Sequence, residues 1–388
     1  MPTRSIHPLT RRAFCATSAA TLLLKHPLLA QTPPLHGSAR PDVAAIDHDR
    51  ILAIADQSLS SKPAPLTTLP APHSLGTPHD FYSEADGNPT AFTAHRDAIL
   101  DLARQVGALT AAFHLTHNER YAKQAALHLH TWFIDPATAM TPALPYAGMI
   151  RGDSKQHFEG ILETVYLAEI AQAIPFLATS DSLPTEDLAA LKTWFASYLQ
   201  WLTTSRLAAL ARDQKDHHAS SWLLQSAAYA RLTGDETTLA DLRHRFKSVT
   251  LRAQTVADGT FPHELTTLYP YRNSLFNLDL LAASCDLLST RFESLWEYEL
   301  QDGPGLHVAM ARHFPFIQRR NIWPYKADLT HFDDLPIRNP SLLFAARAYT
   351  RPEYADLWKT LPPDTSIPEL QRTFPIRQPL LWITRSRA

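Results

Sequence analysis

The chain has little cysteine and little glycine. Of its 388 residues only two are cysteine, Cys15 and Cys285, and 11 are glycine. Cys15 falls in a predicted leader, so the mature chain keeps one thiol, and an intrachain disulfide framework is excluded. Cys285, in the apolar run "LLAASCDLLST", is expected to be buried. Scarce glycine disfavours many tight hairpins and favours a helical protein, in which the 30 prolines mark helix starts and connections.

The chain also lacks an excess of charge of one sign. It has 36 Lys and Arg against 38 Asp and Glu, a formal net charge of -2 with histidine neutral. Nothing in this balance indicates a nucleic-acid partner. The 19 histidines make the charge sensitive to mild acid. No segment outside the leader has the length of apolar sequence that a membrane span needs, so no span is expected.

The N-terminus resembles an export signal. Arg11 and Arg12 in "LTRRAF" precede a mildly apolar run, and Ala30 is a small residue suited to cleavage. We predict a twin-arginine (Tat-type) signal peptide at residues 1–30, a Pro-rich linker at 31–40 and a single domain at 41–388. The mature protein is then expected to be periplasmic or secreted; the alternative is a disordered tail with two chance arginines.

Helical periodicity dominates the rest of the chain. Asn118 is a predicted N-cap, Pro184 a predicted first-turn residue and Gly234 a predicted C-cap. No sustained two-residue alternation indicates a sheet. The pattern predicts an all-α protein with helical segments at 43–61, 94–116, 118–134, 157–178, 184–205, 218–233, 235–256, 274–289, 305–314 and 339–349.

The stretch "KDHHASSW", residues 215–222, is the first candidate site. Its polar residues suit a catalytic centre, a metal site or a polar helix end. A metal site formed by Asp216, His217 and His218 is disfavoured, because adjacent helical residues point about 100° apart and helical metal pairs are usually four residues apart. No second cluster of His or Cys residues has the spacing of metal ligands.

Six phrases in order resemble the alginate-lyase-domain family of bacterial polyuronate lyases. They are "PHDFYSEAD", "AHRDAILDLARQVGALTAAFHLTHNERYA", "HTWFIDPATAMTPALPYA", "RDQKDHHASSWLLQSAAYARLTGD", "ADGTFPHELTTLYPYRNSLFNLD" and "NIWPYKADLTHFDDLPIRNPSLLFAARAY". The resemblance covers residues 78 to 358. It implies an incomplete (α/α) toroid of stacked helical hairpins with a substrate groove, and a polysaccharide lyase acting on an anionic polysaccharide or oligouronide. It also implies β-elimination without a metal or organic cofactor.

This chemistry needs three groups. The C5 proton of a uronate is weakly acidic, so donors or cations must neutralise its carboxylate. A base removes that proton, and an acid protonates the departing O4. The family resemblance implies that a Tyr takes one or both proton roles and that a His with an Asn–Arg set supplies the rest.

The family resemblance places His218 at the catalytic histidine. Relatives usually have two asparagines where this chain has Asp216 and His217. His217 is predicted to donate a hydrogen bond or a positive charge to a uronate carboxylate. The alternatives are that His218 is an ordinary helix-end histidine and that His217 merely faces solvent.

The second phrase departs further from the family. Thr267 stands where relatives have an Arg, and Asn273 where they have the catalytic Tyr. We predict that Tyr271 and Arg272 take over these roles, with Tyr269 also close. The alternative is a packing tyrosine beside a surface arginine.

Other residues complete the predicted groove. The catalytic set is His217, His218, Tyr271 and Arg272, and the substrate-binding set is Tyr146, Asp216, Trp222, His263 and Asn273. Core packing is the favoured alternative for Trp222, and loop packing is the alternative for Tyr146. A weaker prediction places a far wall at Trp323, Tyr325, Lys326 and His331.

Two other functions remain open at this point. A catalytically altered or degenerate relative would bind carbohydrate without cleaving it, as the residues at 267 and 273 suggest. A glycoside hydrolase would need two facing carboxylates, for which Asp216 with Glu264 or Glu163 could serve.

Overall fold

The computed structural model describes residues 37–85, 90–151 and 157–384. From His36 onward the chain forms one compact unit. The predicted signal peptide, Cys15 and most of the predicted linker lie outside the described residues.

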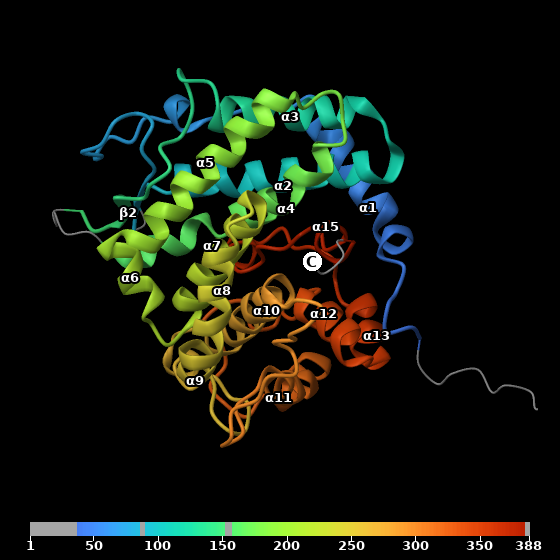
Figure 1. Cartoon of the computed structure of the whole chain (residues 1–388). Helices are drawn as coiled ribbons and strands as arrows, with labels where there is room; N and C mark the ends of the chain where they lie inside the picture. The colour runs from blue at the N-terminus through green and yellow to red at the C-terminus, as the bar shows by residue number, and fades with distance from the viewer. Residues whose placement is uncertain (1–36, 86–89, 152–156, 385–388) are drawn as a thin grey trace, which may run out of the picture. The chain divides into compact units, whose positions relative to one another are not determined.

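Five helices form an inner row in which each packs on the next. In chain order they are α2 (Ala94–Thr116), α4 (Leu167–Leu177), α7 (His217–Thr233), α10 (Pro270–Leu288) and α12 (Pro340–Tyr349). Other helices alternate with them along the chain and cover the row from outside (Figure 1): α1 (Val43–Ser58), α3 (Glu119–Phe133), α5 (Thr185–Thr204), α8 (Glu236–Arg245) and α13 (Pro352–Thr360). This row of helical hairpins confirms the predicted all-α, incomplete (α/α) toroid.

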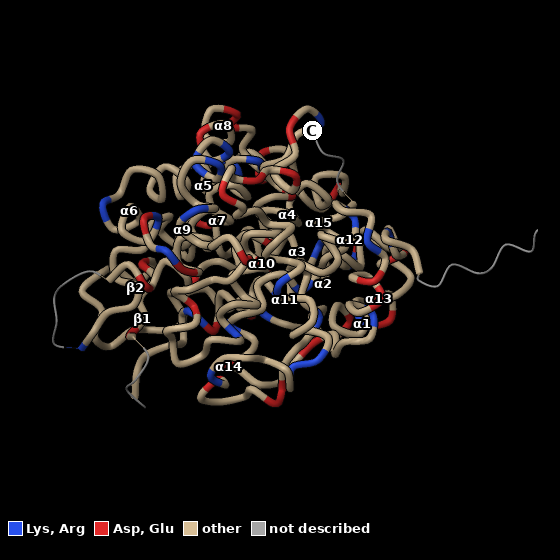
Figure 2. The backbone as a smooth tube through the Cα atoms, turned by 90° about the horizontal axis from the view of Figure 1, so that it is seen from below, with Lys and Arg blue, Asp and Glu red and all other residues tan. Residues whose placement is uncertain are grey.

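Burial explains which helices lie inside. In α10 nearly every residue from Pro270 to Leu288 is buried, and α7 is buried almost as completely. A helix that is apolar or small-sided all round is stable only when other helices surround it. In α3, by contrast, buried residues recur along one face and charged residues occupy the other. Figure 2 shows Lys and Arg interspersed with Asp and Glu around the described part of the chain.

Local signals place most helix ends. The Asn118 side chain accepts a hydrogen bond from the Arg120 N–H, and Gly234 ends α7 with a φ of 74°, as a left-handed C-cap requires. Pro184 is the N-cap residue of α5 rather than part of its first turn. Two predicted helices are interrupted: a 3₁₀ segment, η2 (Phe158–Thr164), precedes α4, and a π-helical segment, η3 (Phe246–Thr250), separates α8 from α9 (Leu251–Gln254).

Shorter elements join the helical rows. They are α6 (Arg206–Arg212), α11 (Leu306–Gln318), α14 (Pro368–Gln371), α15 (Leu380–Ile383), η1 (Leu66–Thr68), η4 (Glu264–Thr266) and η5 (Arg320–Ile322). A parallel pair of strands that periodicity did not predict joins β1 (Tyr82–Glu84) to β2 (Tyr146–Met149). Gly160 of η2 packs so closely on β2 that an added Cβ would lie 2.3 Å from the Ala147 carbonyl carbon.

One stretch of the described residues, Phe158–Leu177, is long and apolar enough to span a membrane by length and composition. This stretch differs from the prediction that no segment outside the leader has the length and composition of a membrane span. In its most apolar window 78% is buried inside the protein, as in the core helix of a folded domain.

Candidate functional site

A cavity of about 650 Å³ lies where the N-terminal ends of α2, α7 and α10 meet η2. Inner helices alternate with outer ones along the chain, so the inner helices run in one direction and bring their N-termini to one end. Positive helix-dipole ends favour anions at such a place. The lining residues are Ala85, Arg96, Gly148, Glu159, Gly160, Leu162, Glu163, Tyr166, His217, His218, Leu268, Tyr269, Arg272, Asn273, Phe276, Glu369, Arg372 and Thr373.

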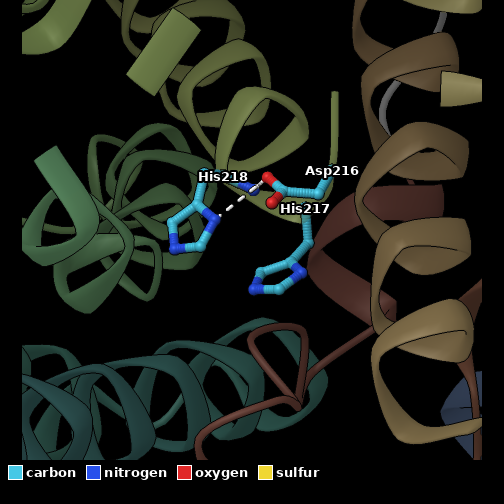
Figure 3. Close-up of side chains that lie close together, drawn as sticks. All are labelled: Asp216, His217 and His218. Carbon is cyan, nitrogen blue, oxygen red and sulfur yellow. Dashed lines mark hydrogen bonds and ion pairs between the residues drawn. The ribbon is translucent and has the colours of Figure 1, made fainter. Parts of the chain in front are cut away.

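Asp216 holds His218 at the start of α7. Oδ1 of Asp216, the N-cap residue, accepts from the His218 backbone N–H at 3.0 Å and lies 3.0 Å from His218 Nδ1 (Figure 3). Burial raises the pKa of Asp216, but the hydrogen bonds and charges of His218 and His217 outweigh it and lower the pKa to about 2. An anionic Asp216 fixes the proton of His218 on Nδ1, which leaves Nε2 as a potential base.

Glu264 holds His217 in the same way from η4. Its two carboxylate oxygens lie 2.7 Å from the His217 backbone nitrogen and 2.9 Å from His217 Nδ1. Glu264 is fully buried, and the two imidazole rings stack with centroids 4.5 Å apart. Burial lowers the pKa of His217, but the charge and hydrogen bond of Glu264, with the charge of Asp216, raise it overall. His217 therefore keeps its imidazolium form to higher pH than an ordinary histidine.

Tyr269 and Arg272 form the facing part of the lining. Tyr269 is the N-cap residue of α10, and the Arg272 guanidinium carbon lies 3.9 Å from the centre of its ring. Arg272 is 7% exposed, and burial lowers its pKa. Its Nε and Nη1 atoms have no hydrogen-bond partner among the described residues.

Thr267 and Asn273, the two residues that depart from the family pattern, lie side by side. The Asn273 amide donates to Thr267 Oγ1 at 3.2 Å, and Asn273 lines the cavity as predicted for a substrate-binding residue. The two positions at which the family resemblance implies an Arg and a Tyr are thus adjacent here but carry neither charge nor phenol.

Tyr271 is the main correction to the predicted site. Its side chain is fully buried outside the cavity lining, and its hydroxyl donates to the Phe316 carbonyl at 3.0 Å. Burial also raises its pKa well above the ordinary value. These contacts are inconsistent with the predicted catalytic role, because the hydroxyl is turned into the core. Tyr269, noted only as a neighbour, is the tyrosine of this loop that reaches the cavity.

Four predicted substrate-binding residues lie outside the lining. One of them is Asp216, which holds His218 at the start of α7. Trp222 is buried and donates from its indole nitrogen to the Leu202 carbonyl at 2.8 Å, in agreement with the packing alternative. Tyr146 is half-buried on β2 and packs against Gly76, where an added Cβ would lie 2.5 Å from its ring. His263 is exposed and lines a separate depression with Lys215 and Arg252.

The residues predicted to form a far wall of the groove do not line the cavity. Trp323 packs on Tyr271 with ring centroids 5.1 Å apart, and the Tyr325 hydroxyl accepts from Arg312. Lys326 is exposed and does not line the cavity. His331 reaches the cavity edge indirectly, through a 3.7 Å contact from Nε2 to the Glu369 carboxylate.

Sequence reasoning missed several lining residues. Arg96 is buried in the first turn of α2, and its Nη1 lies 3.5 Å from the Glu163 carboxylate. Tyr166 donates to the backbone carbonyl of Arg372 at 2.7 Å and so ties the segment after α14 to the cavity. A charged residue on the otherwise apolar face of the 94–116 helix was the available signal for Arg96.

The cluster at the start of α7 could also offer ligands to a cation. One donor atom each from Asp216, His217 and His218 lies within 4.8 Å of the others. This is closer than the helical argument predicted, because Asp216 is an N-cap residue and stands outside the helix. Asp216 Oδ1 already serves the His218 N–H and ring. A metal ion bound through that oxygen would have to replace these bonds.

Comparisons with known proteins agree with the fold. The family model described as alginate lyase matches residues 49–323. A solved alginate lyase from Bacteroides ovatus is 23% identical with a TM-score of 0.75, over 87% of this chain and 94% of that one. Alginate lyase A1-III from Sphingomonas species A1 is 14% identical with a TM-score of 0.51, over 83% and 92%. A His-to-Ala variant of A1-III complexed with a tetrasaccharide gives the same identity and TM-score over 79% and 84%. A comparison with curated sequences finds no match.

Proposed function

Since this chain belongs to the alginate lyase family, we propose that it is a polysaccharide lyase that cleaves a uronic-acid polymer of the alginate or glucuronan type. The observation that carries the proposal is the pair of histidines at one cavity, each held by its own carboxylate. One histidine is poised as a base and its neighbour as a cation, which are two of the three groups that β-elimination needs.

The proposed reaction is one elimination step. His218 Nε2 takes the C5 proton of the uronate, the C5–H electron pair forms the C4–C5 double bond, and the C4–O4 bond breaks. The Tyr269 hydroxyl gives its proton to the departing O4. Asp216 keeps the His218 ring in place and stabilises its charge after proton transfer, as a carboxylate does beside a catalytic histidine.

The electrostatics of the cavity suit an anionic substrate. The pKa of His217 is raised by the charge of Glu264, although burial opposes it, so His217 offers a positive charge to the C5 carboxylate. Helix N-termini surround the same space. A relative of the same fold has been solved in complex with a tetrasaccharide, which supports a saccharide ligand for this chain.

The test is the ultraviolet absorbance of the conjugated double bond that elimination creates. The chain from residue 31 onward is mixed with alginate, polyglucuronate and other uronate polymers, beside His218→Ala and the control His244→Ala, whose residue is exposed on α8 outside the cavity. We expect absorbance to rise on one polymer with the parent chain and the control, but not with His218→Ala. No rise on any polymer with a folded parent chain contradicts the proposal.

Thr267 and Asn273 support a second candidate, a relative that binds uronates without cleaving them. Saturable binding of a uronate polymer without a rise in absorbance would favour it. The hydrolase alternative has less support. Glu264 is fully buried and paired with His217, so Asp216 and Glu264 do not face a glycosidic bond together.

We further propose that the twin-arginine segment exports the protein, as expected for an enzyme that meets a polymer outside the cytoplasm. Arg11 and Arg12 carry this expectation. Replacing both with lysine should trap the full chain in the cytoplasm. Unchanged export of that variant would contradict the proposal.

A further inference from the structure

We infer that Arg272, stacked on Tyr269, is the carboxylate-binding residue of this site. By the family resemblance, relatives carry an Arg and a Tyr where this chain has Thr267 and Asn273. Arg272 and Tyr269 supply that charge and that phenol from shifted positions. The inference rests on the proposed function for its substrate class, a uronate carboxylate. It adds which side chain receives that carboxylate and which gives the proton.

The Arg272 guanidinium is buried, but only part of it is hydrogen-bonded. A side chain only 7% exposed keeps two nitrogens, Nε and Nη1, without a hydrogen-bond partner among the described residues. Buried donors without acceptors are costly, and a ligand in contact with them can supply the missing acceptors. Because Arg272 lines the cavity, an anion in the cavity can supply it.

Asp328, an acidic residue close to Arg272, is already occupied by other hydrogen bonds. Asp328 caps α10, and its two carboxylate oxygens accept from the backbone N–H groups of Tyr271 and Arg272 at 2.8 and 3.0 Å. It stabilises the helix start and so fixes where the Arg272 side chain departs. Among the described residues, Arg272 makes no ion pair within 4.0 Å.

Tyr269 and Arg272 lie next to Thr267 and Asn273, the two positions that depart from the family pattern. Thr267 and Asn273 bond to each other at 3.2 Å, which uses one N–H of the Asn273 amide and an acceptor site of Thr267. Tyr269 and Arg272 lie between them in the sequence, and the guanidinium over the ring keeps both side chains at the cavity. The stacking suits Arg and not Lys, because a planar cation covers the ring face.

Arg272 and His217 each offer a positive charge to the uronate carboxylate, and the two charges differ in their dependence on pH. The guanidinium keeps its charge at every pH at which the protein folds, although burial lowers its pKa. The imidazolium of His217 depends on pH. The resulting site binds a carboxylate over a wide pH range and binds it best below the raised pKa of His217.

The test measures binding separately from cleavage. In the His218→Ala background, calorimetry follows binding of mannuronate and glucuronate tetrasaccharides and of their carboxyl-reduced, neutral counterparts. Arg272→Met keeps the side-chain volume and removes the charge. The control Arg252→Met removes an exposed arginine paired with Asp302 outside the cavity.

We expect Arg272→Met to weaken binding of at least one charged tetrasaccharide roughly tenfold to a hundredfold, the range for one charge-assisted contact. Binding of the neutral counterpart and the binding by Arg252→Met should not change. In the His218-containing chain, Tyr269→Phe keeps the ring under the guanidinium, so it should lower the rate of cleavage and leave the affinity within about twofold.

Three results would overturn the inference. They are unchanged binding of the charged tetrasaccharides by Arg272→Met, equal losses for charged and neutral sugars, and no binding by the parent background. If Arg272→Met does not fold, Arg272→Lys replaces it, with a smaller loss expected for the charged sugars alone. Charge-dependent binding without any cleavage by the His218-containing chain would instead contradict the proposed lyase and leave the carboxylate site standing.

Discussion

Replacing Glu264 with glutamine tests the electrostatic design of the site most sharply. The wild-type carboxylate accepts from both the backbone and the ring of His217, at 2.7 and 2.9 Å, while fully buried. Glutamine can keep the backbone bond with its oxygen, but its NH₂ group then faces His217 Nδ1. That arrangement favours a neutral ring and removes one positive charge from the cavity.

The size of the effect follows from the lost interaction. A hydrogen bond to a charged group contributes about 1.5–3 kcal/mol, which corresponds to roughly a tenfold to hundredfold loss in rate. The loss should be largest at neutral and mildly alkaline pH. In the wild type the charge of Glu264, acting against burial, raises the pKa of His217, so the imidazolium is kept to higher pH than without that charge. Asp216 and the His218 ring also face His217 and are unchanged in the variant.

The assay is the initial rate of double-bond formation between pH 5 and 9. We expect the alkaline decline of activity to begin at a lower pH in Glu264→Gln than in the wild type. The matched control is Glu293→Gln, which removes a half-exposed carboxylate paired with Lys247, and its pH profile should equal that of the wild type. A Glu264→Gln profile that coincides with the wild type, in a protein of normal thermal unfolding, refutes the reasoning.

Other predictions follow from the same structure. His218→Ala should lower activity by about 10²–10⁴-fold with an unchanged thermal transition; loss of the cooperative transition would make His218 structural. Tyr269→Phe should lower activity strongly, whereas Tyr271→Phe should keep it and lose about 1 kcal/mol of stability in urea unfolding, because its hydroxyl bonds only inside the core; the reverse ranking would restore the sequence-based assignment. Burial, although opposed by bonds from two backbone N–H groups, raises the pKa of Glu169 from 4.5 to about 7. Its contribution to stability is therefore full below about 4.5 and lost as pH rises toward 7. Glu169→Gln should remove this dependence, roughly 3 kcal/mol, from unfolding curves recorded between pH 4 and 8, and an unchanged dependence would contradict the account.

The sequence predicted the helices well because their signals are local. Asn118 begins a helix through its side chain and Gly234 ends one through its backbone, and neighbouring residues do not alter this chemistry. The 3₁₀ segment before α4 escaped prediction because its apolar pattern resembles that of an α-helix. The strands β1 and β2 escaped because each is only three or four residues long and pairs with a distant segment.

The candidate site was predicted in part. Two short motifs at helix starts meet at the cavity region, and residues of one motif stay together in space. The start of α7 supplies Asp216, His217 and His218, and the start of α10 supplies Arg272 and Asn273. Tyr271 could not be assigned from sequence, because neighbouring residues of a helix point about 100° apart. Only the rotation of α10 decides that Arg272 faces the cavity and Tyr271 the core.

Residues from distant segments were the hardest to foresee. Arg372 and Thr373 line the cavity although they follow the family-matched region, and the Tyr166 hydroxyl holds that segment in place. No local pattern marks them, since their role depends on the closure of the chain around the inner helices.

The central claim is that the cavity at the start of α7 and α10 supports β-elimination on a uronate polymer. The most direct measurement is the mass and ultraviolet spectrum of the products that the chain from residue 31 onward forms from alginate and polyglucuronate. The account predicts oligosaccharides one water lighter than hydrolysis products, with the absorbance of a conjugated double bond, and none from His218→Ala. Saturated products carrying the full mass of an added water would contradict it and indicate a hydrolase instead.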